Sequence, residues 1–275
     1  MDFSKINKLV KEVENSIKHT SSFNKDEELL VGVDLGTAYI IIVVLDKNHK
    51  PIACEMEFAQ VVRDGLVLDY MGAVIIVRRL KEKLEKRLGI TLKNAAIAIP
   101  PNTEKSNTKT HKYVIEATGL EVVNMLDEPT AANSVLGIYN GAIVDIGGGT
   151  TGLSILKDGE VIYVADEATG GTHLTLVLAG NYGITIQEAE DLKTDKNRQK
   201  EILPVVTPVI QKISSIIKTH IKDYSLNNIY LVGGTSSLEG IEDIIAKELN
   251  IPTEKPINPF LVTPLGIAMN CYLKE

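Results

Sequence analysis

The chain has 275 residues, of which 44% are hydrophobic, 24% charged and only 5% aromatic, and its formal net charge is −7. The absence of a basic block and of tryptophan disfavours a nucleic-acid groove that depends on base stacking and phosphate neutralisation. Cys54 and Cys271 are the only cysteines, which predicts free buried thiols rather than a disulfide framework or a thiolate metal site. No segment reads as a membrane span or a signal peptide, so we expect a cytoplasmic protein with no membrane partner.

The first 28 residues are predicted to form an amphipathic helix followed by a linker. Polar residues around Ser21 and Asn24 break the helical pattern. We expect the helix to pack against the rest of the protein, and docking to a partner protein is the alternative. The apolar residues of the helix recur at helical spacing: Phe3, Ile6, Val10, Val13 and Ile17.

Residues 29–139 are predicted to form a first lobe, in which strands alternate with helices. Gly89 and Gly119 are typical helix ends, and Pro129 favours the first turn of a helix that Gly137 terminates. The expected strands are 29–34, 39–45, 51–58, 95–99 and 121–126, and the expected helices are 74–88, 105–118 and 129–136.

Residues 140–275 are predicted to form a second lobe on the same plan. The polar stretch TDKNRQKEIL separates two of its helices, and we expect it to be a solvated loop, too short for an outer subdomain. The sequence is compatible both with a last helix that packs on the second lobe and with one that packs back on the first lobe. The expected strands are 142–146, 152–157, 160–168 and 228–232, and the expected helices are 172–181, 186–193, 204–222, 238–249 and 264–273.

Two stretches resemble each other, VGVDLGTAYIIIVVL from Val31 and VDIGGGTTGLSIL from Val144. In each, an aspartate ends an apolar run and glycines with hydroxyl residues follow, which predicts two similar halves that each open with a β-hairpin. Bare N–H groups and threonine hydroxyls in such a turn suit a phosphate. Asp34 and Asp145 would lie beside that phosphate only with a cation between them, for which we expect hydrated Mg²⁺. An ordinary glycine hairpin is the alternative.

Three further turns carry residues that suit a nucleotide, although each also has an ordinary structural interpretation. The run Gly233-Gly234-Thr235 follows a predicted strand and precedes a helix, where nucleotides often bind. Glu128 lies in the first turn of a predicted helix, where an acid usually serves the helix dipole. The pair Gly170-Gly171 is also typical of a plain turn.

In their order along the chain, these motifs resemble those of the actin/Hsp70-type ATPase superfamily. GVDLGTAY and VDIGGGTTG resemble its two phosphate motifs, LDEPTAAN and PFLVTPLGIAMN its two connecting motifs, and LVGGTSSLEG its adenosine motif. No G-x-x-x-x-G-K-[ST] signature competes with this interpretation. The run GGTHLTLVLAGNYGITIQEAEDLK, with ILPVVTPVIQKISSIIKTHI, is similar to the EutJ family of ethanolamine-utilisation proteins within that superfamily.

The resemblance implies a two-lobed actin/Hsp70-like fold of duplicated RNase H-like domains, in which the outer subdomain of the second lobe is reduced. It implies ATP or ADP with Mg²⁺ as cofactors: Asp34 and Asp145 would be catalytic by ordering Mg²⁺ and its waters, and Glu128 by orienting the attacking water. Glu190 and Lys193 keep the spacing of the superfamily's nucleoside-contacting residues, with a surface ion pair as the alternative. The other residues expected to hold the nucleotide are Gly36, Thr37, Gly147, Gly148, Gly149, Thr150, Thr151, Gly170, Gly171, Gly233, Gly234 and Thr235.

The EutJ resemblance implies a chaperone-like factor for the assembly, protection or reactivation of ethanolamine ammonia-lyase or its bacterial microcompartment. No lysine can be assigned to the role of Hsp70's catalytic lysine, so we expect slow hydrolysis of ATP. An actin-like filament or scaffold subunit and a small-molecule kinase of the same fold are the alternatives. We expect a monomer or small oligomer, because the second lobe lacks a subdomain for one end of a repeated contact.

Overall fold

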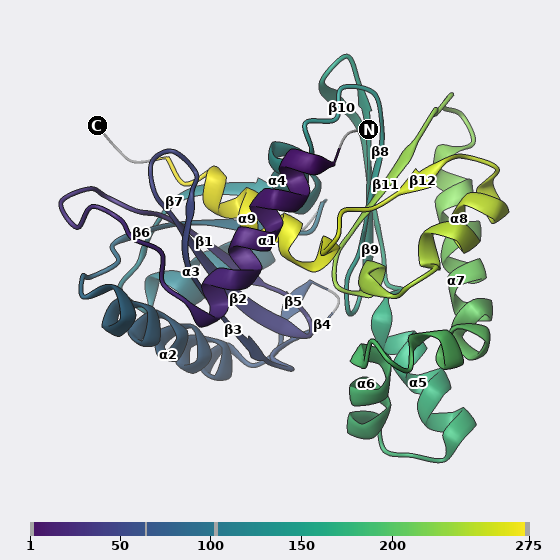
Figure 1. Cartoon of the computed structure of the whole chain (residues 1–275), viewed down its shortest axis with the longest axis horizontal. Helices are drawn as coiled ribbons and strands as arrows, with labels where there is room; N and C mark the ends of the chain where they lie inside the picture. The colour runs from purple at the N-terminus through teal and green to yellow at the C-terminus, as the bar shows by residue number, and fades with distance from the viewer. Residues whose placement is uncertain (1–2, 64, 102–103, 273–275) are drawn as a thin grey trace. The chain divides into compact units, whose positions relative to one another are not determined.

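The computed structural model describes residues 3–63, 65–101 and 104–272, and these form two compact units (Figure 1). The first unit extends to Gly137 and resumes at Pro256, while the second comprises Ile138–Lys255. The chain therefore leaves the first unit, builds the second, and returns to complete the first. Each unit is described separately below.

The first unit is built on one five-stranded sheet. Its elements are α1 (Ser4–Lys18), β1 (Leu30–Leu35), β2 (Tyr39–Leu45), β3 (Pro51–Phe58), β4 (Val62–Arg63), β5 (Leu66–Val67), α2 (Tyr70–Leu88), β6 (Asn94–Ile99), α3 (Lys105–Glu116), β7 (Glu121–Asp127), α4 (Glu128–Leu136), η2 (Pro259–Leu261) and α9 (Val262–Met269). The strand order is β3-β2-β1-β6-β7, in which β1 and β2 form an antiparallel hairpin and β6 and β7 run parallel to β1. The small β4–β5 hairpin was not predicted.

Helices cover both faces of this sheet. Side chains of α2 and α3 share a core with alternate residues of the central strands, among them Val33. Successive residues of a strand point to opposite faces, and on the other face α9 packs against β1 and α4. Small residues permit this close approach, because a Cβ on Gly32 would collide with Ala268 and one on Gly266 with Ala131.

The N-terminal helix α1 lies against β3, with Val10 and Val13 fully buried. Arg87 of α2 holds its C-terminal end, where Nη2 donates to the Ser16 carbonyl at 2.7 Å and Nη1 to the Ile17 carbonyl at 3.2 Å. Carbonyl groups at a helix C-terminus lack intrahelical donors, and a cation there also favours the helix dipole. The apolar face of α1 is occupied within the first unit, which favours packing against the protein over docking of a partner.

The second unit repeats this plan on another five-stranded sheet. Its elements are β8 (Gly141–Ile146), β9 (Thr151–Lys157), β10 (Glu160–Glu167), α5 (Gly171–Tyr182), α6 (Ile186–Thr194), α7 (Gln199–Ile221), β11 (Ile229–Val232), η1 (Thr235–Ser237), α8 (Ile241–Leu249) and β12 (Thr253–Glu254). The strand order is β10-β9-β8-β11-β12, with β8 and β9 antiparallel and β11 and β12 parallel to β8. Order and direction match those of the first sheet, which confirms the predicted duplication of an α/β domain.

Helix α7 begins at Gln199, ahead of its predicted start at Pro204. An interior proline usually destabilises a helix by about 3 kcal/mol. Two contacts before the proline offset this cost: Ile202 is fully buried in the core, and the Gln199 side-chain carbonyl accepts from the Glu239 N–H at 2.9 Å. The predicted solvated loop therefore shrinks to residues 195–198, and the reduced outer part of the second lobe is confirmed.

Helix bounds differ from the predictions elsewhere as well. Helix α2 begins at Tyr70, ahead of its predicted start, because the Asp69 carboxylate caps it by accepting from the Gly72 N–H at 2.8 Å. The last helix ends at Met269, and the predicted end at residue 273 lies outside the described residues. Among the helices of the described segments, none combines the length and the apolar character needed to cross a membrane.

Both cysteines are free and buried, as predicted. Burial is the largest effect on the Cys54 thiol and raises its pKa to about 12. Burial also raises the pKa of the Cys271 thiol. Because the thiolate is the reactive form, both side chains behave as small apolar core residues at neutral pH.

Candidate functional site

The first unit gathers its predicted site residues at one edge of its sheet. Strands β1, β6 and β7 are parallel, so Asp34 near the end of β1 and Glu128 directly after β7 belong to the same edge. Gly36 lies in the β1–β2 turn, where an added Cβ would be 2.8 Å from the Tyr39 carbonyl. Thr37 follows it and is half-buried. The carboxyl end of this sheet therefore carries Asp34, Glu128 and a tight glycine-threonine turn.

The acid that precedes Glu128 has a structural role. The Asp127 carboxylate accepts from the N–H and the hydroxyl of Thr130, both at 2.8 Å, and so caps α4. Pro129 occupies the first turn of this helix, as predicted. Glu128 is thus presented at a helix terminus whose geometry is set by its neighbours.

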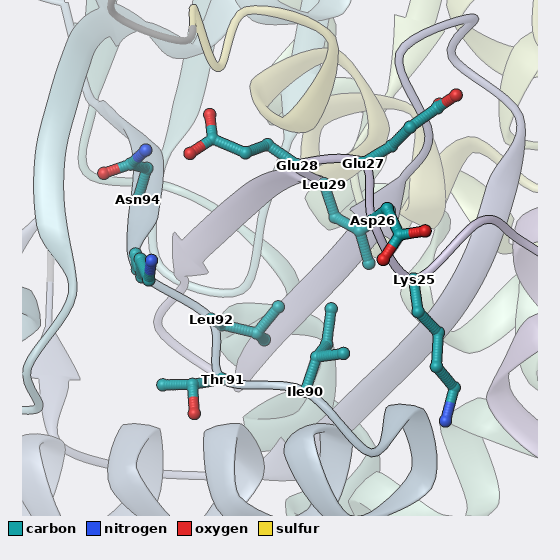
Figure 2. Close-up of a pocket in the computed structure, with 10 residues that line it drawn as sticks. Lys25, Asp26, Glu27, Glu28, Leu29, Ile90, Thr91, Leu92 and Asn94 are labelled. Atoms are coloured by element: carbon teal, nitrogen blue, oxygen red, sulfur yellow. The ribbon is translucent and has the colours of Figure 1, made fainter.

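A cavity of about 310 Å³ lies elsewhere in the first unit (Figure 2). It is lined by residues 25–29 and 90–94, at the amino ends of β1 and β6. Exposed Lys25, Asp26 and Glu28 give its surroundings charges of both signs. Ligands of open α/β sheets bind at the carboxyl ends of the strands, where the predicted site residues lie, so the cavity is not part of the candidate site.

In the second unit, the carboxyl ends of β8 and β11 bring two predicted motifs together. Asp145 pairs with Val232 in parallel register, so the turns that follow these strands leave the sheet at the same edge. Gly233 has a φ of 89°, a conformation that favours glycine. A Cβ at this position would also collide with the Asp145 carboxylate. The glycine is therefore required by the packing of the two turns.

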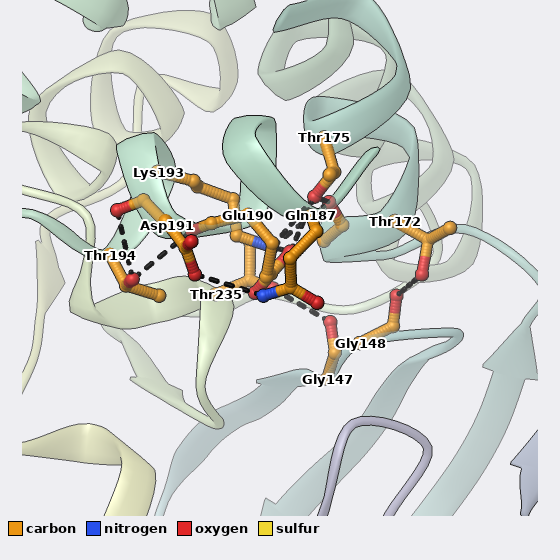
Figure 3. A network of polar contacts seen from close by, with 11 residues as sticks. Gly147, Gly148, Thr172, Thr175, Gln187, Glu190, Asp191, Lys193, Thr194 and Thr235 are labelled. Carbon is orange, nitrogen blue, oxygen red and sulfur yellow. Dashed lines mark hydrogen bonds and ion pairs between the residues drawn. The ribbon is translucent and has the colours of Figure 1, made fainter. Parts of the chain in front are cut away.

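The turn after β8 is held by its first carbonyl group (Figure 3). The Gly147 carbonyl accepts from the Thr235 hydroxyl at 2.7 Å and from the Gly171 N–H at 2.9 Å. Across the turn, the Gly147 N–H donates to the Thr150 carbonyl at 2.9 Å. The sequence presented the motifs at 147–151, 170–171 and 233–235 as separate turns. In the structure all three meet at Gly147.

The next carbonyl group is held in the same way. The Gly148 carbonyl accepts from both the N–H and the hydroxyl of Thr172, each at 2.8 Å. The C=O and N–H of one trans peptide unit point in opposite directions, so the N–H groups of Gly148 and Gly149 point away from α5. Successive N–H groups on one side of a turn form an anion-binding concavity. The turn therefore presents donors that suit a phosphate.

Two glycines let the start of α5 approach this turn. A Cβ on Gly170 would lie 2.7 and 2.9 Å from the two carbonyl oxygens of the turn, and one on Gly171 would collide with the Thr235 hydroxyl. The N–H groups in the first turn of a helix need partners from outside the helix. Those of Gly171 and Thr172 find them in the turn carbonyls, so this helix terminus holds the turn in place.

Thr172 was not among the predicted site residues, although the sequence contains a signal for it. The tripeptide Gly-Gly-Thr occurs at 148–150, 170–172 and 233–235. The threonines of the second and third copies hold the carbonyl groups of the turn formed by the first. A glycine pair permits close approach of two backbones, and the threonine that follows can then reach a carbonyl group.

Glu190 and Lys193 form an ion pair at 2.7 Å, with side chains that are only 17% and 12% exposed. The structure thus shows a partly buried pair and not the exposed surface pair considered as the alternative. Lys193 Nζ also donates to the Thr175 hydroxyl at 3.0 Å and to the Gly171 carbonyl at 3.3 Å. The pair therefore ties α6 to the start of α5.

The remaining predicted residues of the second unit lie in the same turns. The Thr151 hydroxyl is buried and donates to the Thr169 carbonyl at 2.6 Å, so in this structure it supports the hairpin. Thr150 is half-buried, Gly149 is buried and Gly234 is exposed. The edge of the second sheet thus collects the predicted glycines and threonines, with Asp145 at its centre.

The duplicated sheets and their glycine turns define the fold of the actin/Hsp70-like ATPases. A sequence profile described as Type IV pilus assembly protein PilM matches residues 110–269. The crystal structure of MreB5 of Spiroplasma citri bound to ADP is similar, with a TM-score of 0.70, 18% identity and coverage of 87% of this chain and 94% of that one.

Greater similarity connects the chain to one branch of this class. The ethanolamine utilization protein EutJ of Salmonella typhimurium is 43% identical over 244 residues, which are 88% of this chain and 86% of that protein. The crystal structure of EutJ from Carboxydothermus hydrogenoformans is 44% identical, has a TM-score of 0.93, and is covered over 98% of this chain and 99% of that one. The chain belongs to the EutJ family of ethanolamine utilization proteins, as the resemblance of its sequence implied.

We expect Gly170→Ala to destabilise the protein by about 1–3 kcal/mol, because the added methyl group meets two carbonyl oxygens that other donors hold in place. Gly180→Ala in α5, the helix that Gly170 precedes, is the matched control, since a Cβ there has no neighbour within 4 Å. Alanine should stabilise that position by up to about 1 kcal/mol. Urea denaturation followed by circular dichroism measures both effects, and equal midpoints for the two variants would contradict the packing of the turn.

Proposed function

We propose that the protein binds ATP and ADP together with Mg²⁺ and acts as a cytoplasmic, chaperone-like factor in ethanolamine utilisation. The observation that carries the proposal is the turn after β8, whose carbonyl groups are held inside the second unit while two of its N–H groups point away. Such a turn suits a phosphate group. The ADP complex of MreB5 supports a nucleotide as the ligand, and membership of the EutJ family supports the metabolic context.

Each unit would supply one phosphate turn. Gly36 and Thr37 would hold the outer phosphates from the first unit through an N–H group and a hydroxyl. Residues 147–151 of the second unit would hold phosphate oxygens, with Thr151 acting through its backbone because its hydroxyl is engaged. The turn at 233–235 would face the adenosine. These roles follow the motif order of the superfamily and the geometry of the turns described above.

The carboxylates of Asp34 and Asp145 suit Mg²⁺. In nucleotide sites this ion usually keeps several waters and binds one or two carboxylates together with phosphate oxygens. Across the segments that the structure describes, no group of three or more His, Cys, Asp or Glu side chains is arranged to hold a metal ion. The Asp34 and Asp145 carboxylates therefore fit an ion that also binds the nucleotide. When bound, such an ion would neutralise phosphate charge.

Hydrolysis of ATP would be slow. Glu128 would orient the attacking water, but no lysine of the sequence matches the one that stabilises the transferred phosphoryl group in Hsp70. On α2, Lys81 is already engaged, because it pairs with Glu85 at 2.7 Å. A slow turnover suits a switch in which a client protein distinguishes the ATP state from the ADP state.

The proposed client is ethanolamine ammonia-lyase or a protein of its bacterial microcompartment. The protein would assist the assembly, protection or reactivation of that client, as the family relationship suggests. We propose that it does so as a monomer or small oligomer. Because the chain has the fold of a nucleotide-dependent superfamily, the client's affinity would depend on which nucleotide is bound.

Saturating Mg-ATP or Mg-ADP should raise the melting temperature, since a ligand at about 100 times its Kd stabilises the folded state by about 2.7 kcal/mol. Gly148→Val should abolish the shift, because its side chain would occupy the space beside the turn's N–H groups, while the nucleotide-free protein stays folded. Gly180→Ala should retain the shift. Calorimetry that detects no binding at millimolar Mg-ATP would contradict the proposed site.

Asp145→Asn and Glu128→Gln should lower turnover roughly a hundredfold and change the Kd for ATP much less, because these groups act mainly in the transition state. Asp127→Asn is the control, since asparagine also caps a helix and turnover should stay unchanged. Single-turnover assays with labelled ATP separate binding from chemistry. Unchanged turnover in both test variants would remove these residues from the mechanism.

Immobilised protein should capture purified ethanolamine ammonia-lyase, or a purified shell protein of the microcompartment, to different extents in Mg-ATP and Mg-ADP. The difference should disappear in Gly148→Val, which is expected to bind no nucleotide. Surface plasmon resonance with each purified client measures the effect directly. Capture that is absent, or equal in both nucleotides, would count against a nucleotide-dependent client switch.

A further inference from the structure

We propose that Lys193 is a positioning residue of the phosphate turn and does not contact the nucleoside. This inference rests on the proposed function, because it concerns how the second unit holds a nucleotide. It also departs from the nucleoside-contacting role that the superfamily resemblance implied for Glu190 and Lys193. Three observations within the second unit support it: the hydrogen bonds of Lys193, its burial, and its connection to the turn after β8.

All the hydrogen-bond donors of Lys193 are engaged. An ammonium group has three N–H donors and no acceptor. Lys193 Nζ donates to the Glu190 carboxylate at 2.7 Å, to the Thr175 hydroxyl at 3.0 Å and to the Gly171 carbonyl at 3.3 Å. The side chain has no further donor to offer to a ribose or a base.

The surroundings of the ion pair keep Lys193 in this arrangement. Its side chain is 12% exposed and that of Glu190 is 17% exposed, and Thr175 is buried. The Thr175 hydroxyl lies 2.7 Å from the same oxygen of Glu190 that accepts from Lys193. A partly buried charge separated from its partner is costly, so the pair resists rearrangement toward a ligand.

Lys193 reaches the phosphate turn through Gly171 (Figure 3). The Gly171 carbonyl accepts from Lys193, and the N–H of the same residue donates to the Gly147 carbonyl at 2.9 Å. An added Cβ on Gly171 would lie 3.2 Å from Lys193 Nζ and would collide with the Thr235 hydroxyl. Gly171 is therefore held between Lys193 on one side and the turn on the other, and its position helps to set the direction of the Gly147 carbonyl.

The direction of that carbonyl decides where the turn's N–H donors point. The N–H of Gly148 belongs to the same peptide unit as the Gly147 carbonyl and faces the opposite way. Lys193 thereby acts on the phosphate and not on the nucleoside. Loss of Lys193 should weaken every ligand that carries the phosphates, whether or not a nucleoside is attached.

The test compares Mg-ATP with magnesium tripolyphosphate, which lacks the nucleoside, by calorimetry on the full chain. Lys193→Met should weaken both ligands by the same factor, roughly tenfold or more for a misplaced binding group. Lys196→Met, at an exposed lysine just after α6, is the matched control and should leave both affinities unchanged. The ratio of the two Kd values should stay that of the wild type in every variant.

Two further variants guard against a loss of folding. Glu190→Gln combined with Lys193→Met removes the carboxylate that the single variant leaves unpaired, and it should show the same common loss. Thr235→Val removes another donor to the Gly147 carbonyl and should also weaken both ligands. The melting temperature of each ligand-free variant shows whether it is folded.

A Lys193→Met variant that loses affinity for ATP but keeps its affinity for tripolyphosphate would overturn the proposal and make Lys193 a nucleoside ligand. Unchanged affinity for both ligands in the folded single and double variants would also overturn it. Wild-type protein that binds neither ligand would instead refute the proposed function. Wild-type protein that binds ATP but not tripolyphosphate would refute the role of the turn while leaving nucleotide binding intact.

Discussion

The carbonyl groups of Gly147 and Gly148 both turn into the second unit, where the start of α5 and the Thr235 hydroxyl hold them. This arrangement accounts for the other unusual features of that region. Gly170 and Gly171 must lack a Cβ so that α5 can come close, and Gly233 must lack one so that Asp145 fits beside the neighbouring turn. The three glycine-threonine segments therefore depend on one another, and the cost in chain entropy of so many glycines is offset by the hydrogen bonds that their close approach permits.

The two units have sheets of the same topology, but the turns of their central hairpins differ. Strand order and direction agree between β3-β2-β1-β6-β7 and β10-β9-β8-β11-β12, and each central hairpin carries an aspartate near the end of its first strand. In the first unit the turn closes on itself, with Gly36 against the Tyr39 carbonyl. In the second unit the turn is longer and relies on helices α5 and α6 for its shape. The position of the aspartate is thus the same in both copies of the domain, while the contacts that hold the neighbouring turn differ.

Much of this arrangement could be predicted from the sequence, because the chemistry of a glycine turn is local. Asp145 and its glycines follow an apolar run directly, and the same pattern at Asp34 pointed to the duplication. The start of α7 could not be predicted, because Pro204 favours a first turn locally while the burial of Ile202 depends on distant parts of the chain. The spacing of Glu190 and Lys193 places them on one helix face, but only the packing of α5 decides whether that face meets solvent. Local rules therefore located the turns, and tertiary contacts determined which side chains support them.

The return of the chain to its first unit has a consequence for biosynthesis. Helix α9 packs against β1 and α4 through contacts so close that Gly32 and Gly266 have no room for a side chain. Translation proceeds from the N-terminus, so β1 and α4 leave the ribosome long before α9, and the second unit is made between them. Until Met269 has emerged, the surface that receives the buried side chains Leu265 and Ile267 of α9 stays open to water, and a nascent chain that stalls after Lys255 would present that apolar surface to cellular holdases and proteases.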